Sequence, residues 1–176
     1  AGHKIQLFHA PGETNDQLFV WLPEKKALFP GDNFYKTFPN LYTIRGTPYR
    51  DLVGWVNSID MMRYLGPEYL VPSHTRPIVG KEKINTLLTT YRDAIQFVHD
   101  QTVRLMNLGL DPNEIAEQLV LPKHLGDSPY LKEFYGTPAW SAKNVFSGYL
   151  GWFDGNPSTL KPLPLKDEAE KMIQLS

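Results

Sequence analysis

Residues 17–32 read Gln-Leu-Phe-Val-Trp-Leu-Pro-Glu-Lys-Lys-Ala-Leu-Phe-Pro-Gly-Asp, two short apolar runs that are each followed by a turn beginning with proline. The runs at 17–22 and 27–29 are rich in β-branched and aromatic residues, a composition that is typical of strands. The charged residues 23–26 between them suit a hairpin-like turn, because their side chains stay in water. This stretch predicts two neighbouring strands and, after them, a Pro-Gly turn that carries a carboxylate.

Similar runs lie on either side of this stretch, at 4–8 and at 69–71, and each is bounded by turn-forming residues. Between them, residues 49–65 carry apolar side chains at helical spacing, and a Gly-Pro pair ends the pattern. Strands that are followed by a helix and a further strand indicate an α/β layered half-domain, which we expect to occupy residues 1–80.

Beyond residue 80 the pattern is helical. Apolar residues from 81 to 108 form one long stripe, and Gly109 ends it in the position that follows a helix C-terminus. Asp111, Pro112 and Glu114 together signal the start of a new helix. Further helices are predicted over 129–135, 138–153 and 166–175. Residues 81–176 are therefore expected to form an all-helical domain of stacked hairpins.

Composition excludes several classes of protein. The chain has 176 residues, a formal net charge of −1 and no cysteine. The balanced charge argues against binding to nucleic acid or to an anionic membrane, and the lack of cysteine excludes disulfides, cysteine-ligated zinc and cysteine nucleophiles. No apolar run approaches the roughly 20 residues of a membrane span, so we expect a soluble chain. Its compartment (cytoplasmic, periplasmic or secreted) stays open.

The two ends of the sequence also carry an expectation. The chain opens at Ala1 without a methionine, and its last predicted helix reaches Ser176 without a stop signal. We therefore expect that the protein has a further N-terminal part and that the helical domain continues beyond Ser176.

Three predicted strands end in a turn that carries a potential metal ligand. Glu13 and Asp32 each follow a Pro-Gly pair, and His74 follows Val-Pro-Ser. Taken alone, each is more simply explained as a polar turn or a structural histidine. Taken together at one edge of a sheet, two carboxylates and one imidazole suit zinc or a similar divalent ion. A dinuclear site needs about six or seven ligands, so three donors are only part of one.

Longer strings in the chain are more specific. They are Leu-Pro-Glu-Lys-Lys-Ala-Leu-Phe at 22–29, Asn-Leu-Tyr-Thr-Ile-Arg-Gly at 40–46, His-Asp-Gln-Thr at 99–102 and Tyr-Leu-Gly-Trp-Phe-Asp-Gly-Asn-Pro at 149–157. With the three turns, these strings resemble the alkylsulfatases, and the resemblance covers about residues 5–170. It implies the C-terminal half of a metallo-β-lactamase αββα sandwich, followed by an all-α helical-hairpin dimerisation domain.

The resemblance implies roles for five residues. In the family, a glutamate, a bridging carboxylate and a histidine bind two zinc ions, and these ligands fall on Glu13, Asp32 and His74; the bridging residue of relatives is more often glutamate. The asparagine and arginine that hold the sulfate group fall on Asn40 and Arg45. Arginine suits this role because its planar guanidinium matches two sulfate oxygens. No residue is assigned as the catalytic acid.

The activity that the resemblance implies is zinc-dependent hydrolysis of an alkyl sulfate ester to an alcohol and inorganic sulfate. The family's His-x-His-x-Asp-His motif is absent from this sequence, so we expect a partial enzyme that requires the N-terminal half of the catalytic domain. A histidine that some relatives carry near the active site aligns with Trp140. A sterol-carrier-like domain, common in the family, would begin beyond Ser176. The alkyl chain length and the choice between C–O and S–O cleavage stay open.

The helical domain is expected to form a homodimer, with Tyr91, Val98 and Leu105 as candidate contacts. Two alternatives remain. One is another hydrolase of metallo-β-lactamase fold, such as a lactonase or phosphoesterase, which a small polar pocket would favour over the long apolar groove of a sulfatase. The other is a non-enzymatic interaction module whose helices bind a partner protein.

Overall fold

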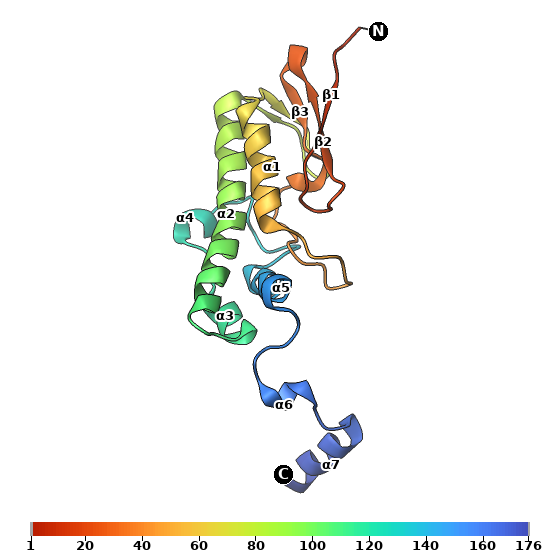
Figure 1. The fold of residues 1–176 in the computed structure, drawn as a ribbon. Coiled ribbons are helices and arrows are strands. Elements are labelled where there is room, and N and C mark those ends of the chain that lie inside the picture. The colour runs from red at the N-terminus through yellow and green to blue at the C-terminus, as the bar shows by residue number, and fades with distance from the viewer. Residues whose placement is uncertain (1, 176) are drawn as a thin grey trace.

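Five short strands form one sheet in the sequential order β1-β2-β3-β4-β5, and Figure 1 shows the helices that accompany it. The computed structural model describes residues 2–175. The strands are β1 Gln6–His9, β2 Leu18–Leu22, β3 Ala27–Phe29, β4 Tyr69–Leu70 and β5 Ile78–Val79. The first four confirm the predicted strands, whereas β5 was not predicted from the sequence.

The direction of the strands decides where the loops lie. β1, β2 and β3 pair antiparallel, while β3 pairs parallel with β4. β1, β3 and β4 therefore run the same way, and the turns that follow them meet at one edge of the sheet. Residues 23–26 form the predicted turn, as a short 3₁₀ helix, Pro23–Lys25, that ends with Lys26 in a left-handed conformation (φ 46°).

Seven α-helices account for half of the remaining described residues. They are α1 Leu52–Tyr64, α2 Lys81–Asn107, α3 Pro112–Gln118, α4 Lys123–Gly126, α5 Pro138–Leu150, α6 Pro157–Leu160 and α7 Leu165–Leu175. The predicted start signals act as expected: the Asp111 side chain accepts hydrogen bonds from the first turn of α3, and Glu114 bonds back to the Asp111 N–H. A second 3₁₀ helix, Gly31–Asn33, follows β3.

The helix predicted over 129–135 is wrong, because this segment forms turns. The carbonyl of Lys132, which a helix would use internally, instead accepts hydrogen bonds from the Phe38 N–H (2.9 Å) and the Thr37 hydroxyl (2.6 Å). A contact between segments about 95 residues apart therefore overrides the local pattern. We call residues 131–136 the docking loop.

The hydrophobic core is continuous from the sheet to the helices. α1 and α2 lie side by side against the sheet, and α3, α4 and α5 gather around the lower half of α2 (Figure 1). Trp55 and Ile59 of α1 are fully buried, as are Tyr91 and Val98 of α2. The proposal that Tyr91, Val98 and Leu105 contact a second subunit is therefore wrong, since all three pack inside this chain.

The two halves of the chain conform to the predicted fold class, a small sheet with its helices followed by an all-helical region. The domain boundary at residue 80 stays a prediction; α2, which begins there, packs on α1. α6 and α7 lead away from the other elements, and their side chains are exposed (Figure 1). Among the described residues, no helix has the length and apolar character needed to cross a bilayer.

Candidate metal and substrate site

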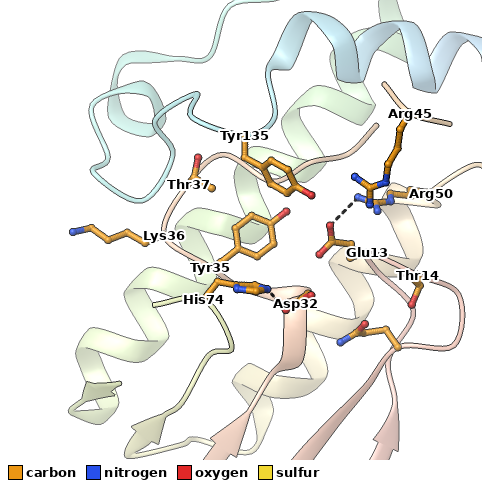
Figure 2. A pocket seen from close by; sticks show the side chains of 11 residues that line it. Glu13, Thr14, Asp32, Tyr35, Lys36, Thr37, Arg45, Arg50, His74 and Tyr135 are labelled. Atoms are coloured by element: carbon orange, nitrogen blue, oxygen red, sulfur yellow. Dashed lines mark hydrogen bonds and ion pairs between the residues drawn. The ribbon is translucent and has the colours of Figure 1, made fainter. Parts of the chain in front are cut away.

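A cavity of about 490 Å³ opens at the edge of the sheet where β1, β3 and β4 end (Figure 2). Glu13, Asp32 and His74 all line it, so the structure brings together the three ligands expected from the sequence. Arg45 also lines it. The other lining residues are Thr14, Gln17, Tyr35, Lys36, Thr37, Arg50 and Tyr135.

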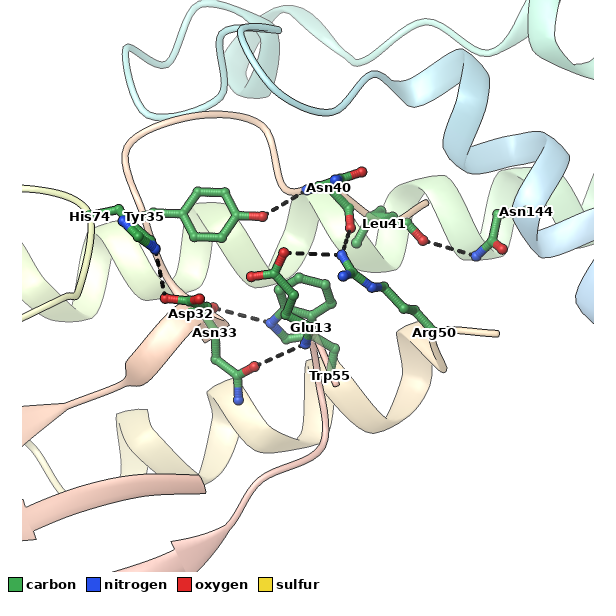
Figure 3. A network of polar contacts seen from close by, with 10 residues as sticks. All are labelled: Glu13, Asp32, Asn33, Tyr35, Asn40, Leu41, Arg50, Trp55, His74 and Asn144. Carbon is green, nitrogen blue, oxygen red and sulfur yellow. Dashed lines mark hydrogen bonds and ion pairs between the residues drawn. The ribbon is translucent and has the colours of Figure 1, made fainter. Parts of the chain in front are cut away.

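The loops that carry the two carboxylates are joined by the side chain of Asn33, which is fully buried. Its Oδ1 accepts a hydrogen bond from the Glu13 N–H (3.2 Å), and its Nδ2 donates to the carbonyl of Ala10 (2.7 Å). Figure 3 shows this amide between Asp32 and Glu13. Gly12 is required here, because a Cβ at that position would overlap the Asn33 Oδ1.

Helix α1 anchors the same two loops from below. The indole N–H of Trp55 donates to the Asn33 carbonyl (3.1 Å), and the Ser58 hydroxyl donates to the Pro11 carbonyl (2.7 Å). Both side chains are buried or nearly so. Because buried polar groups are costly to leave unpaired, these bonds fix the strand-end loops relative to the core.

A buried arginine that sequence reasoning missed holds Glu13. The Arg50 side chain is only 5% exposed, and its Nη1 donates to the Glu13 Oε1 (3.2 Å) and to the backbone carbonyl of Asn40. Nothing in the local sequence marks Arg50 except its place directly before Asp51, the residue whose side chain caps α1. The ion pair joins the first carboxylate turn to the segment that carries the candidate substrate-binding residues.

Burial raises the pKa of the Glu13 carboxyl above its ordinary value of 4.5. The Arg50 guanidinium lowers this pKa without offsetting the burial, and the neighbouring Asp32 carboxylate raises it further. Glu13 therefore lies where more positive charge would stabilise its ionised form.

The other two predicted ligands contact each other. The His74 Nε2 lies 3.2 Å from the Asp32 Oδ1, and both side chains are more exposed than that of Glu13. Figure 2 shows the pair on the opposite side of the cavity mouth from Arg50.

The donor set fits part of a metal site. Two carboxylates and an imidazole are ordinary ligands of divalent ions. Burial and the Asp32 carboxylate raise the pKa of Glu13, and a bound cation would stabilise its ionised form. Within residues 2–175, no three His, Asp or Glu side chains are close enough to hold a metal ion by themselves. Ligands from outside this chain would have to complete the site.

The two predicted substrate-binding residues lie in different positions. Arg45 is exposed and lines the cavity, and within the described part of the chain it makes no ion pair. The acids that could have paired with it have other partners, since Glu68 contacts Lys26 (2.6 Å) and Asp51 caps α1. Asn40 is buried behind the cavity wall, where its N–H donates to the Tyr35 hydroxyl (2.8 Å).

The helical part of the chain also reaches the cavity. The docking loop brings Tyr135 to its rim, with the ring 5.9 Å from the ring of Tyr35. Trp140, which was aligned with an active-site histidine of relatives, lies in the first turn of α5 and is not among the lining residues. Asn144 of the same helix donates to the Leu41 carbonyl (2.9 Å), as Figure 3 shows.

Comparison with known families assigns both halves of this architecture. A model of the metallo-beta-lactamase superfamily matches residues 1–74, and a model named alkyl sulfatase dimerisation matches residues 111–176. The sheet and the helix that packs on it thus match part of a metallo-β-lactamase domain, and this superfamily implies metal binding.

The particular family follows from individual relatives. The chain is 44% identical to a linear primary-alkylsulfatase of a Pseudomonas species, and the match covers 99% of this chain and 34% of that protein. It is 36% identical to an alkyl/aryl-sulfatase of Saccharomyces cerevisiae, and that match covers 94% of this chain and 26% of the yeast protein. The solved stereoselective inverting sec-alkylsulfatase Pisa1 of Pseudomonas superposes with a TM-score of 0.93 at 31% identity, over 99% of this chain and 28% of that one. The resemblance to the alkylsulfatase family is confirmed, over a segment that spans about a quarter to a third of those proteins.

We expect Asn33→Ala to weaken the fold at this edge of the sheet. The change leaves the Glu13 N–H and the Ala10 carbonyl without their partner, so the free energy of unfolding should fall by about 2 kcal/mol or more. Urea denaturation measures this. Asn113→Ala, at an exposed position on α3, is the control; it removes only a solvent-exposed hydrogen bond from Lys143 (2.7 Å) and should change stability by less than about 1 kcal/mol. Equal urea midpoints for Asn33→Ala and wild type would show that the amide does not hold the loops.

The raised pKa of Glu13 predicts a pH dependence in the metal-free chain. At pH values between the ordinary pKa of 4.5 and the raised pKa of the folded state, Glu13 is more protonated in the folded than in the unfolded state. Its contribution to stability therefore falls as the pH rises through this range. Glu13→Gln removes that contribution. In thermal melts with a chelator present, wild type should lose stability relative to the variant as pH rises from 4.5 towards neutrality. Parallel pH profiles would contradict the shift.

Proposed function

We propose that this chain is the metal-binding and substrate-binding C-terminal part of a zinc-dependent alkylsulfatase, which hydrolyses alkyl sulfate esters to an alcohol and inorganic sulfate. The observation that carries the proposal is the presence of Arg45 in the same cavity as Glu13, Asp32 and His74. An arginine that has no ion-pair partner among residues 2–175, beside a cluster of metal-type ligands, suits a small oxyanion whose ester bond is to be broken.

In this proposal Glu13, Asp32 and His74 would hold zinc together with ligands supplied by the N-terminal half. When bound, the metal pair would supply a water of lowered pKa and positive charge near the ester. Arg50 keeps the Glu13 carboxylate in place through one of its oxygens. Arg45 would orient the sulfate group with its fork of N–H donors, and Asn40 would support this segment through its contacts with Arg50 and Tyr35.

The alternatives are less well supported. The wall that this chain contributes combines charged and polar groups with the aromatic rings of Tyr35 and Tyr135, so the cavity alone does not separate a sulfatase from a phosphoesterase or lactonase. Similarity over nearly the whole chain to proteins named alkylsulfatases favours the sulfatase. A purely non-enzymatic module would not require a buried ion pair behind a ligand cluster.

We also propose a homodimer, on the strength of the dimerisation model that matches residues 111–176. The apolar contacts must come from exposed residues, because the stripe of α2 is used internally. Leu165, Met172 and Leu175 of α7 and Trp152 before α6 are all more than 60% exposed and suit this role.

Reconstitution tests the function. The chain alone should bind zinc weakly and hydrolyse no alkyl sulfate, because three donors do not complete two metal sites. Combined with an N-terminal portion of a related alkylsulfatase that carries His-x-His-x-Asp-His, it should release alcohol and sulfate from a medium-chain alkyl sulfate. The control is the same portion with its histidines replaced by alanine. Full activity of the chain alone, or a reconstituted enzyme that cleaves a lactone or phosphate ester but no sulfate ester, would contradict the proposal.

In the reconstituted enzyme we expect Arg45→Lys to lower kcat/KM for alkyl sulfates by about ten- to a hundredfold. Lysine keeps the charge but loses the two-point contact with sulfate oxygens. The melting temperature should stay within about 1 °C, because Arg45 is exposed and unpaired. Arg104→Lys, on the exposed side of α2, is the matched control. An unchanged kcat/KM in Arg45→Lys would remove the sulfate-binding role.

A further inference from the structure

Tyr135 is held at the cavity by contacts that fix its whole loop. The Thr37 hydroxyl donates to the Lys132 carbonyl (2.6 Å) and accepts from the Phe134 N–H (3.2 Å), while the Gly136 N–H donates to the Phe38 carbonyl (3.3 Å). A Cβ at Gly136 would overlap the Pro39 carbonyl, so the docking loop lies directly against the backbone of the segment that leads to Asn40. The position of Tyr135 is therefore set by the fold.

The hydroxyl of Tyr135 is available to a ligand. Figure 2 shows it turned toward the side of the cavity where Glu13 and Arg45 lie. The neighbouring Tyr35 is buried, and its hydroxyl is already engaged with the Asn40 N–H, whereas Tyr135 is 46% exposed. Among residues 2–175, no side chain or backbone group forms a hydrogen bond with the Tyr135 hydroxyl.

The other cation at the rim does not compete for this role. Lys36 points away from the cavity centre in Figure 2, and its ammonium lies 5.5 Å from the centre of the Tyr130 ring. Arg45 and Tyr135 both line the cavity, and in Figure 2 their donor groups lie on facing sides of the same space.

We propose that Tyr135, a residue of the helical region, is a substrate-binding residue that donates a hydrogen bond to the sulfate group; this inference rests on the function proposed above. A sulfate monoester has three terminal oxygens, and a bidentate arginine binds two of them. The third oxygen needs a donor from another direction, which a neutral hydroxyl on the opposite wall supplies. The substrate site is then completed by a loop that lies within the range of the dimerisation model.

Tyr135→Phe tests the inference, because it removes the hydroxyl and keeps the ring that packs on Tyr35. Inorganic sulfate is the probe, and its binding is measured by calorimetry on the reconstituted enzyme. We expect sulfate to bind about tenfold more weakly to the variant, since a hydrogen bond to a charged group is lost. The KM for an alkyl sulfate should rise by a similar factor with kcat changed less than about twofold, the pattern of a contact made in ground and transition states alike.

Phe134→Ala is the control, since its side chain is 84% exposed on the same loop and lies outside the cavity lining. It should leave sulfate affinity and KM unchanged. Equal sulfate affinity and KM in Tyr135→Phe and wild type would overturn the role of Tyr135 while leaving the sulfatase proposal intact. A wild-type reconstituted enzyme that binds no sulfate and cleaves no sulfate ester would instead reject the proposed function and, with it, this inference.

Discussion

The site depends on one buried amide. Asn33 bonds to the backbone on both sides of the Pro-Gly turn before Glu13, and it follows Asp32 directly in the chain. Two strand-end turns that are about twenty residues apart in sequence are thereby held as one unit. The contact needs Gly12, because any side chain there would occupy the space of the amide oxygen. A candidate site built on loops thus gains the rigidity that loops alone do not have.

Arg50 joins this unit to the segment that carries Asn40 and Arg45, the candidate substrate-binding residues. It is a buried cation whose bonds run to the carboxylate of Glu13 and to the backbone of Asn40. Breaking a buried pair of this kind leaves an uncompensated charge in a region of low dielectric, so the two segments cannot separate without a large loss of stability. The candidate metal ligands and the candidate sulfate-binding segment therefore keep a fixed relation.

The sequence predicted the parts that depend on local pattern. Strands bounded by proline and glycine, the capped start of α3, and three ligand-type side chains at strand ends could be read directly, and the shared direction of β1, β3 and β4 brings those ends together. Contacts between distant segments could not be read. Arg50 and Tyr135 look like ordinary polar residues until the chain is folded, and the stripe of α2 fits a subunit interface as well as an internal core. Lys132 shows the same limit, because its carbonyl bonds to residues far back in the chain and not along a helix.

That long-range docking has a consequence for how the cavity is assembled. The bonds from Thr37 to Lys132 and from Asn144 to Leu41 close loops of 95 and 103 residues. Contacts between residues so far apart in the sequence cost loop-closure entropy, and the packing of the intervening helices offsets this cost. The rim that carries Tyr135 therefore exists only when α2, α3 and α5 are all in place. A destabilising change in any of these helices would therefore also disturb the rim that carries Tyr135.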